Sequence, residues 1–258
     1  IGMKVDLSAA VLHRLADADV AVLFCDWRGI PEGGCYSWSD HGRVAARHRA
    51  QADMTLPRKK NAWARIIRAK IEGQANVLQN LGRSGSSELF ALADQVRSGD
   101  PDNIEARAAR FYWSRVLGEG RQPGAGQLIG SNACLDYGYA VLRGHVIRAV
   151  LSAGLAPALG VFHRGRGNAF ALADDLIEPF RPAIDEAALQ LSPTASPSDS
   201  DVKRVLVAAA SQKFDADGYG ISAVAQDLAQ QYGRYVEGEE ERLKVPSWQG
   251  PASTDLSG

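Results

Sequence analysis

The sequence predicts an α+β protein in which a small β-rich domain precedes a larger all-helical domain. The first observation is a short apolar run at residues 20–25 (VAVLFC), which polar and glycine-containing positions follow at once. The second is a series of long segments from residue 42 onward that have the 3.6-residue apolar period of helices. We therefore place a partial, β-sandwich-like domain at residues 1–40 and an α-helical domain at residues 41–258.

The N-terminal region is predicted to hold one helix and one strand. Residues 8–18 (SAAVLHRLADA) have the pattern of a short amphipathic helix, with Ser8 or Asp6 as its N-cap. The run at 20–25 is typical of a buried strand, and residues 29–34 (GIPEGG) are typical of turns. Because the chain opens on IGMKV, which is typical of the middle of a strand, we expect further strands upstream.

The remaining elements are predicted to be helices separated by breaks that contain glycine or proline. Periodic apolar patterns indicate helical segments at residues 42–52, 55–79, 86–97, 101–117, 131–153 and 201–235. Residues 192–201 (SPTASPSDSD) form a loop by composition, and Asp201 is the expected cap of the helix that follows. Either Asp100 or Asp102 is expected to cap the helix at 101–117.

Composition excludes several classes of protein. Hydrophobic residues make up 45% of the chain, but no apolar run approaches the ~20 residues of a membrane span, and no signal-peptide pattern opens it. The three cysteines (Cys25, Cys35 and Cys134) are scattered and form no CxxC pair, which argues against a disulfide framework and a zinc site. We therefore expect a cytoplasmic protein with no membrane partner.

Charge is segregated along the chain although the net charge is only −1. Residues 42–70 contain nine basic side chains and a single acid, whereas residues 237–241 contain four glutamates. A basic face is typical of proteins that bind DNA through its phosphates. The same segment is equally compatible with a solvated helix face.

Residues 160–182 (GVFHRGRGNAFALADDLIEPFRP) hold the first candidate ligands. His163 lies in a loop rich in glycine and arginine, and Asp175 and Glu178 follow in apolar surroundings, spaced to share one helix face. Two acids in such a place need a compensating cation, which a divalent metal or an arginine supplies. Spacing by itself favours an ion pair between Glu178 and Arg181.

Two further segments have structural explanations when each is taken alone. Glu105 falls in the first turns of the helix at 101–117, where the helix dipole favours an acid whatever the function. Residues 131–143 (SNACLDYGYAVLR) have the pattern of a buried helix with polar interruptions, and their spacing assigns them no function.

In combination and in this order, the three segments resemble the CRISPR-associated integrases (the Cas one family), particularly those of type II systems. The motifs that carry the resemblance are EARAARFYW (105–113), NACLDYGYAVLR (132–143) and the block at 160–182. The stretches KIEGQA (70–75) and LAQQYGRYVEG (228–238) agree as well, so the resemblance covers most of the chain. Ala106, Asp136 and Gly167 depart from the family pattern, and they put local DNA contacts in doubt more than activity.

The resemblance implies a metal-dependent DNA endonuclease and integrase, which inserts spacer DNA into a CRISPR array when a DNA 3′-hydroxyl attacks a repeat phosphodiester. It implies that Glu105, His163 and Glu178 bind Mg²⁺ or Mn²⁺. Asp175 is a further candidate, because family members differ in whether the last ligand is aspartate or glutamate. The implied partners are protospacer and repeat DNA, a second copy of the chain, and the small ferredoxin-like Cas two protein.

Arginine and lysine residues supply the expected DNA contacts. Arg164 and Arg166 flank His163 and are the preferred phosphate contacts, and the other candidates are Arg181, Arg58, Lys59 and Lys60. Two other functions stay open. One is a nuclease that cuts branched DNA without integrating it, and the other is a DNA-binding scaffold without catalytic activity.

Overall fold

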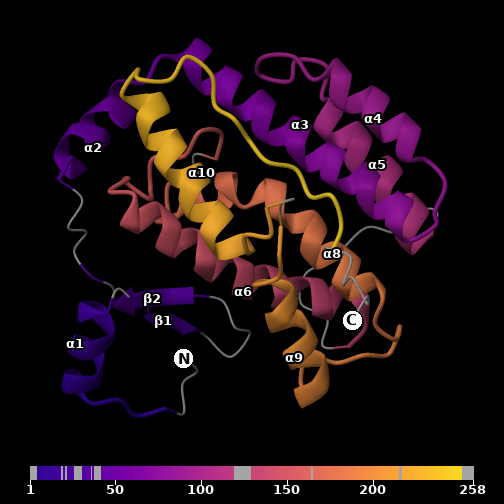
Figure 1. The fold of residues 1–258 in the computed structure, drawn as a ribbon, viewed down its shortest axis with the longest axis horizontal. Coiled ribbons are helices and arrows are strands. Elements are labelled where there is room, and N and C mark those ends of the chain that lie inside the picture. Colours follow the sequence, from indigo (N-terminus) through magenta and orange to yellow (C-terminus); the bar gives the residue numbers. More distant parts are fainter. Residues whose placement is uncertain are drawn as a thin grey trace.

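The computed structural model describes residues 5–18, 20, 22–25, 31–35, 37, 42–118, 129–163, 165–214 and 217–251. Over these residues the chain is mainly helical, with one two-stranded sheet beside helix α1 at an edge of the helical body (Figure 1). None of the described helices is both long and apolar enough to cross a membrane. The division into domains at residue 40 stays a prediction.

The N-terminal elements confirm one helix and one strand and correct the turns. Helix α1 (Ala9–Asp17) begins after Ser8, whose hydroxyl accepts a hydrogen bond from the Val11 amide. Strand β1 (Val22–Cys25) pairs antiparallel with β2 (Pro31–Cys35), so residues 31–34, predicted as turns, lie in a strand. Glycine lowers strand propensity, but the Gly33 and Gly34 backbones still pair with β1, and this tertiary pairing overrides local preference.

The first helices of the body follow the predicted segments closely. They are α2 (Val44–Asp53), α3 (Leu56–Asn80), α4 (Ser86–Gln95), α5 (Ile104–Leu117) and α6 (Ser131–Ser152). Helix α3 is the longest at 25 residues, and it packs against α4, α5, α8 and the short helix η1. Its buried face, which includes Ile66, Ile67 and Ile71, contributes to the main core together with Tyr112 of α5. Helix α3 therefore touches most of the segments that carry candidate ligands.

The second half differs from the prediction in three places, of which the first is that residues 171–189 are mostly helical although they lie outside every predicted helical segment. Its elements are α7 (Ala171–Leu176), η1 (Glu178–Phe180), α8 (Arg181–Leu189), α9 (Ser200–Ala209) and α10 (Ile221–Val236). The single segment predicted at 201–235 is two helices, because the chain turns between them and Lys213 pairs with Gly220 in an isolated bridge. The cap position of α9 is Asp199 and not Asp201, which pairs with Arg204 inside the helix instead.

The C-terminal segment runs from α10 back along α3 towards α8 (Figure 1). It passes through the core at Trp248, which is fully buried and donates a hydrogen bond from Nε1 to Glu186 Oε2 at 2.7 Å. Asn76 of α3 donates to the Trp248 carbonyl at 2.7 Å. A Cβ on Gly73 would lie 3.3 Å from that of Trp248, so glycine lets α3 and this segment approach closely.

Candidate metal centre

Glu105 is held at the start of α5 by an aspartate that caps the helix. Asp100 has a φ of 47° and accepts hydrogen bonds from the amides of Ile104 and Glu105, at 2.8 and 3.0 Å. Of the two aspartates predicted as caps, Asp102 instead pairs with Arg97. Asp100 therefore fixes the backbone of the first turn, from which the Glu105 side chain extends with 28% of it exposed.

Glu178 opens η1 directly after α7 and is only 6% exposed. Its Oε1 lies 2.8 Å from Arg181 Nε, so the ion pair that the spacing favours is confirmed. Burial alone raises the pKa of Glu178, but the nearby Arg181 and Lys70 outweigh it and lower the pKa to about 2. The side chain is thus a carboxylate over the whole physiological pH range.

Lys70 of α3 connects Glu178 to Glu105. Its Nζ lies 2.6 Å from Glu178 Oε2 and 2.9 Å from Glu105 Oε1, and its side chain is 15% exposed. Burial lowers the pKa of Lys70, but the carboxylates of Glu178 and Glu105 outweigh that effect and raise it. One cation thus joins two of the residues predicted to bind a metal, although they come from separate helices.

His163 forms a hydrogen bond with Asp175, which lies in the same block of residues as Glu178. Its Nδ1 lies 2.6 Å from Asp175 Oδ1, and the backbone amides of Val161, Phe162 and His163 also donate to the Asp175 carboxylate. This hydrogen bond to Asp175 raises the pKa of His163 despite partial burial. Because a carboxylate only accepts, Nδ1 carries a hydrogen, and in the neutral imidazole Nε2 then has the lone pair.

The loop that carries His163 is packed against α3. Phe162 stacks on Trp63 with ring centroids 4.4 Å apart, and the His163 ring meets Trp63 edge-on at 5.9 Å. Trp63 and Lys70 are seven residues apart, so they lie on the same face of α3 two turns from each other. A Cβ on Gly160 would approach the His163 carbonyl to 2.5 Å, so the loop requires glycine there.

The donor chemistry fits a hard divalent cation, although the described side chains do not form a complete set of ligands. Among these residues, no group of three His, Cys, Asp or Glu side chains is close enough to hold a metal ion. The carboxylates of Glu105 and Glu178 nevertheless share one cation, the Lys70 ammonium. Glu178 Oε2 is buried, and it has this ion pair but accepts no hydrogen bond from the described residues. His163 is near enough for the charge of Glu178 to contribute to its raised pKa.

The predicted DNA-contacting residues fall into two groups. Arg58 donates to the carbonyls of Tyr235 and Glu240, so its donors are used inside the protein, and Arg181 is engaged with Glu178. Arg166 and Lys60 are exposed and Lys59 is half-buried, whereas Arg164 lies outside the described residues.

The glutamates near the C-terminus neutralise the first part of the basic segment. Glu237 pairs with both Arg43 and Arg47, at 2.9 and 3.2 Å, and Glu239 pairs with Arg43 at 2.8 Å. The segregation of charge in the sequence is therefore largely cancelled in space over α2. The basic character that remains is concentrated on α3.

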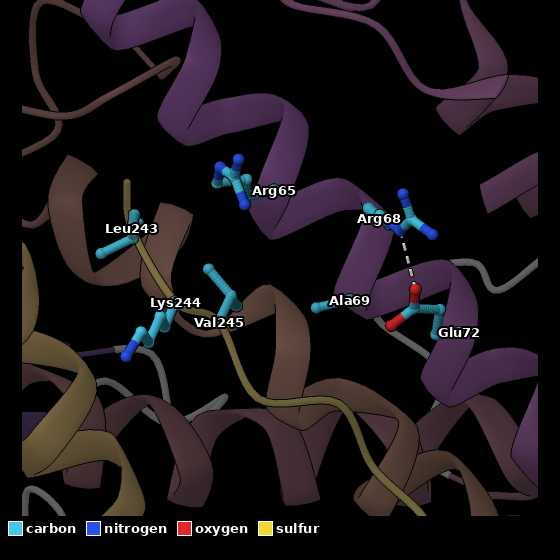
Figure 2. A pocket seen from close by; sticks show the side chains of 7 residues that line it. All are labelled: Arg65, Arg68, Ala69, Glu72, Leu243, Lys244 and Val245. Carbon is cyan, nitrogen blue, oxygen red and sulfur yellow. Dashed lines mark hydrogen bonds and ion pairs between the residues drawn. The ribbon is translucent and has the colours of Figure 1, made fainter. Parts of the chain in front are cut away.

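A groove lies between α3 and the C-terminal segment, with a volume of about 260 Å³. Figure 2 shows Arg65 and Arg68 on α3 on one side and Lys244 on the opposite side, with Arg68 paired to Glu72. Arg68 is also paired with Asp94 at 2.5 Å, so the positive charge of the groove comes mainly from Arg65 and Lys244. Lys244 could not be predicted from the sequence, because only the fold brings it to the same groove as Arg65.

Neither Lys70 nor Trp63 was predicted as a site residue, although Lys70 begins a stretch that carries the family resemblance. The seven-residue spacing from Trp63 to Lys70 was the available signal, since it places both on one face of α3. That face could be assigned to the site only once the fold had brought the loop at 160–163 and η1 against it.

The chain matches one family model and is similar to a named relative in Neisseria meningitidis. The model, described as "CRISPR associated protein Cas1", matches residues 1–117 and 127–206. The "CRISPR-associated endonuclease Cas1" of Neisseria meningitidis serogroup C (strain 8013) is 38% identical over 186 residues, which are 72% of this chain and 60% of that protein. The chain thus spans less than two thirds of the length of that relative.

Solved structures with the same fold include a casposase complex and a Cas1–Cas2 complex. A casposase bound to an integration product has a TM-score of 0.77 at 18% identity, covering 93% of this chain and 78% of that one. A partial Cas6-RT-Cas1–Cas2 complex has a TM-score of 0.66 at 18% identity, covering 94% and 84%. At such identity these similarities concern the fold.

Proposed function

This chain belongs to the CRISPR-associated protein Cas1 family, and from that membership we propose that it is a divalent-metal-dependent DNA integrase of CRISPR adaptation. The observation that carries the proposal is the meeting of Glu105 and Glu178 at a single cation, beside a histidine that Asp175 orients. Two carboxylates and one imidazole suit Mg²⁺ or Mn²⁺.

The proposed reaction is a transesterification that needs no oxidant and no nucleophile from the protein. The 3′-hydroxyl oxygen of the spacer DNA attacks a repeat phosphorus, the bond from that phosphorus to the repeat 3′-oxygen breaks, and this oxygen takes up a proton. A bound divalent ion supplies Lewis acidity, which favours ionisation of the attacking hydroxyl and stabilises charge on the leaving oxygen.

The chain's own residues divide into ligands and supports. Glu105 and Glu178 would contribute carboxylate oxygens and His163 would contribute Nε2. Asp175 is fully buried and its oxygens are engaged by the loop, which supports a role in orienting the imidazole rather than in binding metal. Glu178 is therefore our choice for the last carboxylate ligand.

We assign the DNA contacts to basic side chains that pair with no acid among the residues that the structure describes. Arg166 beside the histidine, Lys60 on α3 and the groove with Arg65 and Lys244 are the sites we propose for phosphate contacts. Assembly with Cas2 is supported by the similarity in fold to the Cas1–Cas2 complex. A homodimer completes the proposed assembly, as the family resemblance implies.

The test is metal-dependent joining of a short duplex with free 3′-hydroxyl ends to supercoiled repeat DNA, with the Cas2 partner present. We compare the wild type with Glu178→Gln and His163→Ala in Mn²⁺, in Mg²⁺ and in EDTA. His13→Ala and Asp201→Asn are matched controls, because both side chains are exposed and far along the chain from the site. The wild type and controls are expected to join DNA, and the two site variants to lose at least about 100-fold in rate.

The outcomes separate the three functions. If the wild type joins DNA and the site variants do not, the result supports the integrase. Cleavage of branched duplexes without joining supports the nuclease, whereas duplex binding without either reaction supports the scaffold. Full joining by both site variants would contradict the ligand assignment.

A further inference from the structure

The position of Lys70 between two carboxylates has a consequence for how a metal enters the site. Its Nζ contacts Glu105 Oε1 and Glu178 Oε2, so a divalent cation bound between these two carboxylates would compete with Lys70 for their oxygens. A primary ammonium and a divalent cation repel each other and cannot occupy the same contacts. Binding of one therefore requires departure of the other.

The surroundings of Glu178 leave only one of its oxygens open to such an exchange. Oε1 is held by Arg181 at 2.8 Å, and the Arg181 guanidinium in turn lies 4.5 Å from the centre of the Tyr139 ring. Oε2 has only the ion pair with Lys70. The lysine side chain is a flexible four-carbon stem, whereas Arg181 is fixed by stacking, so Lys70 is the cation that can leave.

We propose that Lys70 is an internal counter-ion that keeps Glu105 and Glu178 together in the metal-free protein and is displaced when a divalent cation binds. The proposal rests on the metal site of the proposed function. In the metal-free state the ammonium offsets the repulsion between two partly buried carboxylates. In the loaded state the divalent charge replaces it, so metal affinity is reduced by the work of displacing the lysine.

Two measurements on the whole chain test this exchange without recourse to activity. The first is the dissociation constant for Mn²⁺, from the electron paramagnetic resonance signal of free Mn²⁺. The second is the unfolding temperature in EDTA. The variants are Lys70→Met, which keeps the length of the side chain without its charge, and Lys70→Arg, which keeps a cation. Lys203→Met is the matched control, because it removes one exposed lysine from α9.

Lys70→Met is expected to bind Mn²⁺ about tenfold more tightly than the wild type, a typical size for coupling between two bound groups. It is also expected to unfold at a lower temperature than the wild type in EDTA. Added Mn²⁺ is expected to raise its unfolding temperature by more than that of the wild type. Lys70→Arg is expected to keep the unfolding temperature and to bind Mn²⁺ more weakly than the wild type, because a guanidinium bound to two carboxylates is harder to displace. Lys203→Met should match the wild type in both measurements.

Two results would overturn the exchange, and they can be told apart. If the wild type binds Mn²⁺ and Lys70→Met binds it no more tightly, the exchange is wrong while the metal site stands. If neither the wild type nor any variant binds Mn²⁺ at millimolar concentration, the metal site itself is wrong and the exchange falls with it. If Lys70→Met does not fold in EDTA, the Lys70→Arg variant provides the test. A Lys70→Arg variant that binds Mn²⁺ as tightly as the wild type, or more tightly, would contradict the proposal.

Discussion

Gly160 is the residue on which the histidine loop most directly depends. A Cβ at this position would lie 2.5 Å from the His163 carbonyl oxygen and 2.9 Å from Asp175 Oδ2. We predict that Gly160→Ala lowers the free energy of unfolding by about 1–3 kcal/mol, because the loop must move away from the aspartate. Urea denaturation of the metal-free protein measures this change.

Gly167→Ala is the matched control in the same loop, since nothing lies within 4 Å of a Cβ there. Its free energy of unfolding should stay within about 0.5 kcal/mol of the wild type. Equal stability of the Gly160 and Gly167 variants would show that the loop is not held closely to Asp175.

Asp185 is a second residue whose environment predicts a measurable effect. Burial raises its pKa to about 7, although a hydrogen bond from Tyr139 and the nearby Tyr112, Arg181 and Lys70 oppose that shift. A folded pKa above the ordinary 3.8 means that the native state binds the proton more tightly than the unfolded chain. Its contribution to stability is therefore fully present below pH 4 and is lost as the pH rises towards 7.

Asp185→Asn removes this titration. We predict that the variant gains stability relative to the wild type between pH 4 and pH 7, by at most roughly 4 kcal/mol, since each pKa unit corresponds to about 1.4 kcal/mol. Urea denaturation at several pH values measures the difference between the two proteins. A difference that stays constant over this range would contradict the raised pKa.

Among the elements, α5 depends on a cap outside the helix. Asp100 accepts the Ile104 and Glu105 amides, and its loss leaves two buried or half-buried donors unpaired. We predict that Asp100→Ala costs about 1–2 kcal/mol in the free energy of unfolding. Asp102→Ala should cost well under 1 kcal/mol, because its pair with Arg97 is exposed. Thermal unfolding of both variants measures these losses in stability. If the two variants lost equal stability, Asp100 would not be an important cap of α5.

Periodicity predicted the helices well because each buries one face in a common core. It failed where tertiary contacts outweigh local preference, as in the glycine-containing β2 and in the break between α9 and α10. At the site, motif order identified Glu105, His163 and Glu178. The role of Lys70 could not be predicted, because its two partners come from α5 and η1, and their meeting depends on how these helices pack on α3.

At the scale of the whole molecule, the C-terminal segment closes the core. Among the described residues, Trp248 donates to the buried Glu186 carboxylate and Asn80 donates to it at 3.1 Å. We predict that Trp248→Phe lowers the free energy of unfolding by about 2 kcal/mol, because it removes a hydrogen bond to a charged group. The neighbouring Gln249→Ala is exposed and should change it by less than about 0.5 kcal/mol.

Urea denaturation of these two variants measures how firmly the segment is attached. A Trp248→Phe variant as stable as Gln249→Ala would mean that Glu186 keeps its charge satisfied without the indole. A large loss in Trp248→Phe alone would show that the segment is an integral part of the helical body.

The return of the C-terminal segment along α3 also sets the order in which the protein can mature during synthesis. Asn76 and Trp248 are in direct contact, yet the ribosome adds some 170 residues between them, at about 5–20 residues per second. For several seconds α3 is complete while the indole that covers it does not yet exist. The face of α3 against which Trp248 packs therefore stays uncovered until the segment that carries Trp248 has been synthesised, so a nascent chain released before that point keeps this part of the core open.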